Sequence, residues 1–127
     1  MDILGHGRLP IVMPAYPHML SEDTAVWTEF LESGDFALQE VWYDLHVGAV
    51  VKGDWEDDSV PARVAAGLTR KRIDVVALVD GRYWVVEVKP YASMYAVGQI
   101  VVYEGLFIKD YEPVLETWPV IVCHSVD

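Results

Sequence analysis

Basic residues are scarce in this chain. Of its 127 residues, nine are lysine or arginine and 20 are aspartate or glutamate, so the formal charge is −11 at pH 7. Such a charge opposes general attraction to a phosphate backbone. The deficit is uneven, because residues 63–89 carry a local charge of +3 while the remainder carries −14. Nucleic acid is therefore not excluded as a partner, although the run TRKR (69–72) is also typical of a solvated strand entry.

Cysteine and long apolar runs are also lacking. The single cysteine, Cys123, excludes an intrachain disulfide and favours a reducing compartment. Apolar runs such as VVALV are far shorter than the roughly 20 residues that cross a bilayer, and the amino terminus lacks a signal-peptide pattern. We expect a soluble, cytoplasmic protein with no membrane partner. The length suits one domain with its own core, since 53% of the residues are hydrophobic.

The predicted elements follow the order helix, strand, strand, strand, helix, strand. Residues 1–20 are rich in proline and glycine and predict an irregular arm, and residues 21–127 predict a single domain. Helices are expected from Ser21, as a cap, to Gly34, and over 91–107 with Ser93 as a cap; strands are expected within 36–48 and at 72–79, 82–89 and 117–125. We therefore predict an α/β (α+β) domain with a mixed central sheet flanked by helices.

Two of these segments carry more specific expectations. In 36–48 the apolar residues Val41, Tyr43, Leu45 and Val47 alternate with Glu40, Trp42, Asp44 and His46, which predicts a strand with one apolar and one mixed face. Residues 48–69 lack clear periodicity and predict an acidic loop followed by two helical turns at 61–66. A connection of this length is usually functional or mobile.

The Asp80-Gly81 pair between two apolar runs predicts a two-residue β-hairpin turn. If these two residues form the turn, Val79 faces Arg82, and continuing the register places Asp74 opposite Glu87. Like charges placed directly opposite each other destabilise a sheet. Such a pair therefore requires an explanation, and Lys89, two residues beyond Glu87, projects from the same face.

One explanation is a metal site. Two carboxylates this close in a half-buried position cannot both ionise cheaply unless a cation lies between them, and oxygen ligands favour Mg²⁺ or Mn²⁺ over zinc. Lys89 could then hold a phosphate oxygen or a water, as metal-assisted phosphodiester hydrolysis requires. The alternative is a structural cluster in which Lys89 neutralises Glu87 and Arg72 neutralises Asp74.

Asp74 followed by Glu87-Val88-Lys89 at the end of the next strand resembles the PD-(D/E)xK nuclease superfamily, although Ile73 replaces the proline of the pattern. Gln99 and Tyr103 resemble the Q-x-x-x-Y signature of its RecB-like and lambda-exonuclease-like branch. The resemblance spans roughly residues 22–124. It implies a restriction-endonuclease-like core, a Mg²⁺-dependent or Mn²⁺-dependent deoxyribonuclease and products with 5′-phosphate ends.

The resemblance also implies roles for individual residues. Asp74, Glu87 and the carbonyl of Val88 would ligate the metal, Lys89 would serve the attacking water, and Gln99 would hold that water or the phosphate. An acidic residue of the first helix is expected to join them; Glu29 is the preferred candidate, before Glu32 and Glu22, although all three are also typical of solvated helix charges. The predicted substrate contacts are Arg70, Lys71, Arg72 and Tyr103.

Other side chains have open interpretations. Asp44 and His46 share a strand face and are compatible with a second metal or phosphate contact, or with ordinary hydrogen bonding. Tyr91, Tyr95 and Tyr103 suit either base stacking or the core. A second function is a catalytically silent DNA-binding or assembly module of a phage or mobile element. A protein partner that supplies the grip on DNA would offset the acidic surface. Homo-oligomerisation and roles in repair, recombination, restriction and phage replication stay open.

Overall fold

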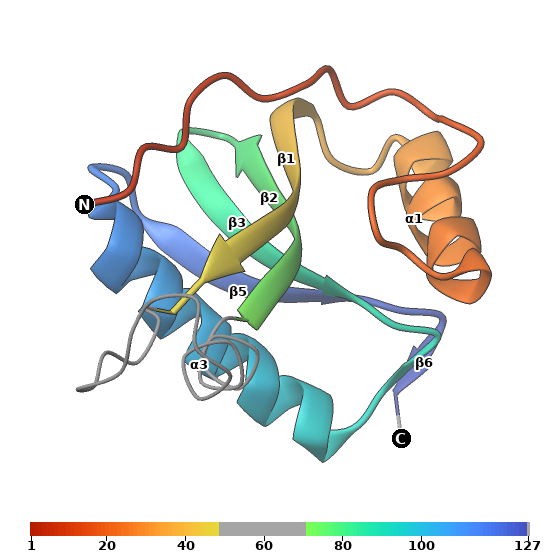
Figure 1. Ribbon diagram of the computed structural model, residues 1–127. Helices are drawn as coiled ribbons and strands as arrows, with labels where there is room; N and C mark the ends of the chain where they lie inside the picture. Colours follow the sequence, from red (N-terminus) through yellow and green to blue (C-terminus); the bar gives the residue numbers. More distant parts are fainter. Residues whose placement is uncertain (49–70, 127) are drawn as a thin grey trace, which may run out of the picture.

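Two helices lie on opposite faces of a mixed four-stranded sheet in the computed structural model, which describes residues 1–48 and 71–126 (Figure 1). The elements in chain order are α1 (Ser21–Ser33), β1 (Leu38–Val47), β2 (Lys71–Val79), β3 (Arg82–Val88), β4 (Tyr91–Ala92), α3 (Met94–Tyr111), β5 (Thr117–Val122) and β6 (Ser125–Val126). The predicted mixed α and β composition and the order of the main elements are confirmed. Two short strands, β4 and β6, are additional.

The central sheet has the strand order β1-β2-β3-β5. β1, β2 and β3 pair antiparallel in succession, and α3 carries the chain back so that β5 lies parallel to β3. β4 and β6 form a separate parallel pair. Neither helix in the described ranges combines the length and the apolar content that a bilayer crossing needs.

The hairpin between β2 and β3 has the predicted register. Val79 pairs with Arg82, and regular pairing continues to Val75 and Val86. The turn residues Asp80 and Gly81 have φ values of +50° and +72°. Positive φ at both central positions is the backbone that a tight hairpin turn requires, which is why the Asp-Gly pair predicts it.

The helix ends follow the sequence only in part. Ser93 caps α3, since its Oγ accepts a hydrogen bond from the Ala96 amide at 3.2 Å, and Gly34 ends α1 with a φ of +65°. The prediction that Ser21 caps α1 is wrong. Ser21 is the first helical residue, and Leu20 occupies the cap position without a side-chain bond. The acidic first turn of α1 still complements the positive end of the helix dipole.

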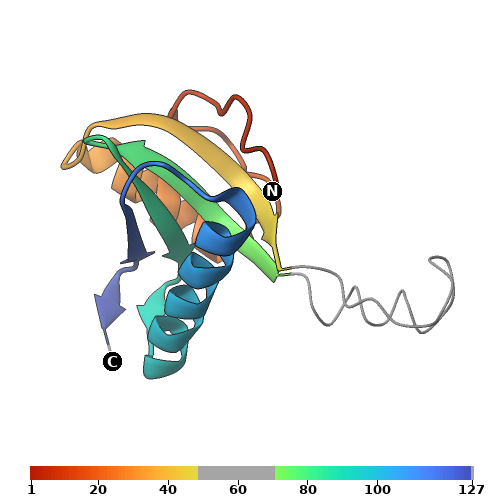
Figure 2. The same ribbon diagram turned by 90° about the vertical axis from the view of Figure 1, so that its left-hand side faces the viewer.

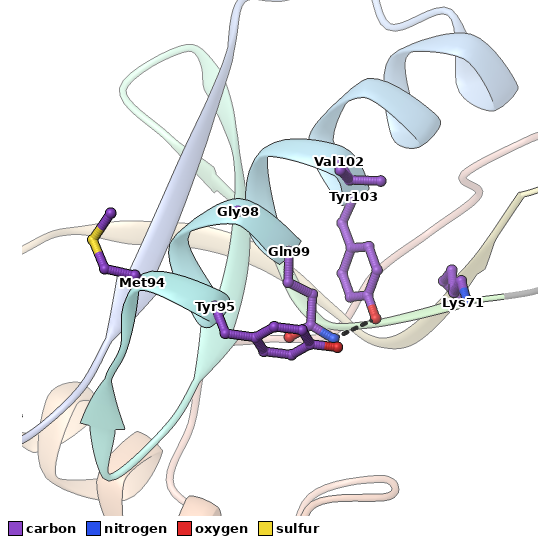
Figure 3. Close-up of a pocket in the computed structure, with 7 residues that line it drawn as sticks. All are labelled: Lys71, Met94, Tyr95, Gly98, Gln99, Val102 and Tyr103. Atoms are coloured by element: carbon purple, nitrogen blue, oxygen red, sulfur yellow. Dashed lines mark hydrogen bonds between the residues drawn. The ribbon is translucent and has the colours of Figure 1, made fainter.

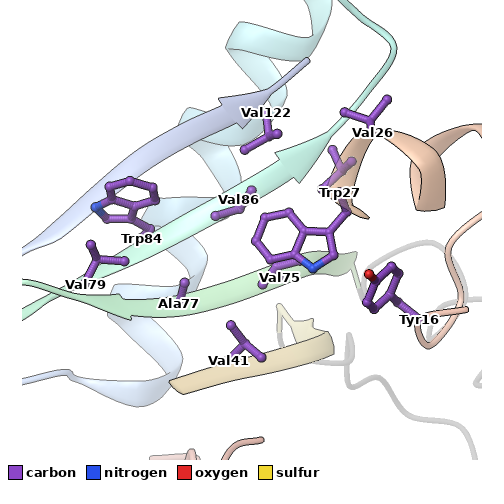
Figure 4. Packing of buried hydrophobic residues seen from close by; sticks show 11 residues of the cluster. Tyr16, Val26, Trp27, Val41, Val75, Ala77, Val79, Trp84, Val86 and Val122 are labelled. Carbon is purple, nitrogen blue, oxygen red and sulfur yellow. The ribbon is translucent and has the colours of Figure 1, made fainter. Parts of the chain in front are cut away.

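Two clusters of buried side chains hold the helices to the sheet. The α1 cluster lies between α1 and the sheet (Figure 4) and contains Tyr16, Val26, Trp27, Val41, Val75, Ala77, Val79, Trp84, Val86, Val88 and Val122. The α3 cluster lies on the opposite face and contains Trp42, Val47, Ile73, Val76, Val85, Ile100 and Phe107. Burial of apolar area on both faces explains why β2 and β3 are almost continuously hydrophobic.

The prediction that the apolar residues of β1 share one face is wrong. Val41 and Tyr43 pack with the α1 cluster, whereas Leu45 and Val47 pack with the α3 cluster. The strand changes face at Asp44, whose φ is +53°. Strict alternation requires an extended backbone at every residue, and a left-handed residue interrupts it.

β2 changes face at the same level of the sheet. Ile73 packs with the α3 cluster and Val75 with the α1 cluster. The pairs Tyr43–Val75 and Leu45–Ile73 flank this level, so the register places Asp44 and Asp74 at the point where both strands turn over. The left-handed residue is Asp44, and Asp74 lies at the same level of the sheet, between the paired residues Ile73 and Val75.

The amino-terminal residues lie along the outer edge of β1 (Figure 2). Arg8 forms an antiparallel bridge with Val41, and the Trp42 indole donates to the Gly5 carbonyl at 3.2 Å. Gly7 permits this approach, because a Cβ there would lie 2.6 Å from the Val41 carbonyl oxygen. The predicted acidic loop, the turns at 61–66 and Arg70 lie outside the described residues.

Candidate active site

Asp74 on β2 and Glu87 on β3 meet where the regular hairpin pairing stops. Beyond the Val75–Val86 pair, Asp74 Oδ2 accepts a hydrogen bond from the Val88 amide at 2.9 Å. The carboxylate thus takes the place of a backbone acceptor between the two strands. The neighbouring amide of Lys89 donates to the Val122 carbonyl at 3.0 Å on the other side, which fixes the end of β3 against β5.

Among the described residues, Glu87 is the one charged residue that is buried, and 4% of its surface is exposed. Its Oε1 lies 3.5 Å from Lys89 Nζ, and its Oε2 is buried without a hydrogen-bond partner. A buried carboxylate oxygen without a partner is costly and rare in a folded protein. Glu87 also shares a side-chain hydrogen bond with Asp74 when one of the two carboxyl groups is protonated. When both groups are ionised, Oε2 has no hydrogen-bond donor.

The pKa values of the two carboxyl groups reflect this position. Burial, reinforced by the negative charge of Asp74, raises the pKa of Glu87 to about 7. Burial also raises the pKa of Asp74, against the opposing effect of the Val88 hydrogen bond. Burial alone would lower the pKa of Lys89, but the charges of Glu87 and Asp74 outweigh it and raise that pKa. The carboxyl pair thus retains a proton more readily than free carboxyl groups, and Lys89 stays charged.

The acidic residue of α1 at this site is Asp23, not Glu29. Burial raises the Asp23 pKa, the charge of Lys89 opposes that rise, and the Asp23 charge in turn raises the pKa of Asp74. Glu29 is exposed, and its Oε2 lies 3.5 Å from His124 Nδ1. In the sequence Asp23 is indistinguishable from other helix-start acids, because only the docking of α1 against the sheet brings it near Lys89.

Glu22 and Glu32, the weaker candidates on α1, are exposed on the surface of the helix. Neither is among the main causes of the pKa shifts of Asp74, Glu87 and Lys89. The site therefore takes one acidic side chain from the first turn of α1.

Gln99 and Tyr103 lie together on α3, where Gln99 Nε2 donates to the Tyr103 hydroxyl at 2.8 Å. Burial raises the Tyr103 pKa, and the charges of Glu87 and Asp74 add to that rise. The helical spacing of the two residues thus places them within electrostatic reach of the carboxyl pair, as the sequence predicts.

The same two residues line a cavity of about 480 Å³ on the surface of α3 (Figure 3). The lining is completed by Lys71, Met94, Tyr95, Gly98 and Val102. Of the two interpretations of the tyrosines, a core position is excluded for Tyr95, which is 79% exposed. Tyr91, at the start of β4, is exposed as well. Of the predicted basic contacts, Lys71 thus lies beside the cavity.

Arg72 lies in a different group. Its guanidinium is 3.3 Å from Asp44 Oδ1, while Asp44 Oδ2 lies 3.2 Å from His18 Nε2 and 3.8 Å from His46 Nε2. Arg72 therefore neutralises Asp44, and the proposed Arg72–Asp74 pair of a purely structural cluster does not form. Only the Lys89–Glu87 half of that alternative is present.

The donor set suits one hard cation. No group of three or more His, Cys, Asp or Glu side chains within 1–48 and 71–126 is arranged to hold a metal ion. Asp74, Glu87 and the Val88 carbonyl provide two carboxylates and a backbone oxygen, and the partnerless Glu87 Oε2 is the atom that a cation would satisfy.

Comparison of the chain with family models, with curated proteins and with solved structures gave no match.

Proposed function

We propose that this chain is a metal-dependent nuclease that hydrolyses DNA phosphodiester bonds, with a restriction-endonuclease-like core of the PD-(D/E)xK superfamily. The observation that carries the proposal is the buried pair Asp74 and Glu87 beside Lys89. Two carboxyl groups with raised pKa values and one partnerless oxygen are an unfavourable structural element, and strongly perturbed groups of this kind cluster at functional sites.

Asp74, Glu87 and the Val88 carbonyl would hold Mg²⁺ or Mn²⁺. When bound, such an ion polarises a phosphoryl oxygen and favours ionisation of water. The Val88 amide holds the Asp74 carboxylate in place through the 2.9 Å hydrogen bond. That bond fixes the direction of one ligand before any substrate arrives.

Lys89 remains charged beside the carboxyl pair, so its ammonium can donate to the attacking water or to a phosphate oxygen. Hydrolysis forms a bond from the water oxygen to phosphorus and breaks the bond from phosphorus to the leaving oxygen. The family resemblance implies that the 5′-phosphate stays on the product. Gln99, whose side-chain amide donates to the Tyr103 hydroxyl, would hold the water or the phosphate.

A second candidate is a catalytically silent DNA-binding or assembly module, of the kind found in a phage or mobile element. The charge of −11 and the pairing of Arg72 with Asp44 favour it, because both weaken the grip on a phosphate backbone. A protein partner that supplies the grip on DNA would reconcile catalysis with this acidic surface.

Cleavage assays separate the two candidates. Linear, branched and single-stranded DNA are incubated with Mg²⁺ or Mn²⁺ and the native chain, Asp74→Asn or Lys89→Ala, with Glu29→Gln as the control carboxylate variant. We expect cleavage by the native chain and by Glu29→Gln, and strongly reduced cleavage by the other two variants. Binding without cleavage by the native chain, under any of these conditions, would favour the silent module.

A further inference from the structure

The cavity on α3 has a lining that suits an uncharged aromatic ring. Its volume of about 480 Å³ lies in the range of small-molecule sites. Most of its lining is apolar or aromatic, from Met94, Tyr95, Val102 and Tyr103, and Gln99 adds an amide. Figure 3 shows Tyr95, Gln99 and Tyr103 projecting from one side of the helix toward Lys71.

The exposed ring of Tyr95 is the clearest sign of a missing occupant. A tyrosine with 79% of its surface in water makes little contact with the core, although it stands at the rim of an apolar cavity. Aromatic rings in this setting bind unpaired bases by stacking, and the stacking is tolerant of sequence because every base has a π face. A nucleobase would cover both the ring and the apolar lining.

The cavity shares two residues with the candidate active site. Gln99 and Tyr103 line it, and the charges of Glu87 and Asp74 contribute to the Tyr103 pKa. Lys71 adds a positive charge at the cavity, and a positive charge attracts the phosphates of a DNA strand. A strand whose phosphate lies at Lys89 could therefore place a neighbouring base in the cavity.

We infer that this cavity binds one unpaired base of the DNA strand, next to the phosphate that is cut. The inference rests on the proposed function for the position of that phosphate. It assigns the substrate class as single-stranded DNA, or a duplex end or flap with a splayed strand. A base inside a stacked, paired duplex could not enter a cavity on the face of a helix.

Gly98 offers a way to close the cavity without disturbing the fold. It lines the cavity, and a Cβ built on it meets no atom within 4 Å. Gly105 lies two helical turns later, outside the cavity lining, and is equally open. Leucine is a better helix former than glycine at either position. Gly98→Leu therefore fills the cavity, and Gly105→Leu is its matched control.

The test measures the affinity for fluorescent oligo-thymidine by fluorescence anisotropy, in EDTA so that no strand is cut. We expect Gly98→Leu and Tyr95→Ala each to bind about tenfold more weakly than the native chain, and Gly105→Leu to bind like it. Competition with an abasic strand of the same length and with the matching duplex separates base binding from phosphate binding. Both competitors are expected to be weaker. Thermal melting verifies that the glycine variants are folded.

Equal binding by the native chain and Gly98→Leu would overturn the inference, and so would equal competition by the abasic strand or an absence of single-strand binding. Cleavage with Mg²⁺ is measured separately. If the native chain binds through the cavity but cuts no DNA, the base site stands and the nuclease proposal fails. If Gly98→Leu binds and cuts single strands like the native chain, the nuclease stands and the base site fails.

Discussion

Replacing Glu87 by glutamine should stabilise the protein at alkaline pH in the absence of metal. The folded-state pKa of Glu87 is about 7, against 4.5 for the free side chain. Because the folded value is the higher one, the associated stability is complete below pH 4.5 and is lost as the pH rises through 7. Glutamine keeps the shape of the protonated acid and does not titrate.

The expected effect is large for a single polar substitution. A pKa displaced from 4.5 to about 7 corresponds to about 3 kcal/mol in the free energy of unfolding at pH 8. For a domain of this size that difference shifts Tm by about 10 °C. The variant and the native chain should converge as the pH falls toward 4.5, where both the folded and the unfolded native chain hold the proton.

The assay is thermal unfolding followed by circular dichroism at several pH values, in EDTA. Glu29→Gln serves as the control, because Glu29 is an exposed carboxylate that lies 3.5 Å from His124 Nδ1, away from the carboxyl pair. The Tm of Glu29→Gln should not rise relative to that of the native chain as the pH increases. A Glu87→Gln variant that melts below the native chain at pH 8, or that keeps the native pH dependence, would refute the assignment of the strained carboxyl pair. Adding Mg²⁺ at pH 8 should raise the native Tm and leave that of Glu87→Gln unchanged.

Three further outcomes follow from the same contacts. Lys89→Ala should lower Mg²⁺-dependent cleavage by about 10²- to 10⁴-fold. The Tm should change little, since the Lys89 side chain is 41% exposed. Steady-state cleavage rates and thermal melting test these two expectations, and native-like cleavage would show that Lys89 takes no part in the chemistry. Asp23→Asn should reduce cleavage where Glu29→Gln does not, as parallel rate measurements can show; the reverse ranking would restore Glu29. Trp27→Ala should cost about 3 to 5 kcal/mol, because the indole is completely buried; a loss below about 1 kcal/mol in urea unfolding would contradict the packing of α1.

The parts of the fold that short-range chemistry decides could be predicted. The Asp80-Gly81 turn fixes the register of β2 and β3, because a two-residue turn leaves one choice of pairing. That register carried Asp74 and Glu87 to the same level of the sheet. Helical spacing likewise placed Gln99 beside Tyr103, which the 2.8 Å hydrogen bond confirms.

The parts that depend on tertiary packing could not be predicted. Alternation gives no sign that β1 turns over at Asp44, because its positive φ belongs to a local backbone state that aspartate adopts only occasionally. The choice of Asp23 over Glu29 depends on how α1 docks. The exposed ring of Tyr95 resembles a core residue in sequence, since periodicity does not tell which apolar stripe of a helix is covered.

Calorimetric titration with Mn²⁺, in the presence and absence of oligo-thymidine, tests most directly whether Asp74 and Glu87 form a metal site. We predict saturable binding by the native chain and at least tenfold weaker binding by Glu87→Gln, with or without DNA. Equal binding by the two proteins, or no binding by the native chain even when DNA is present, would contradict the metal site and with it the proposed nuclease.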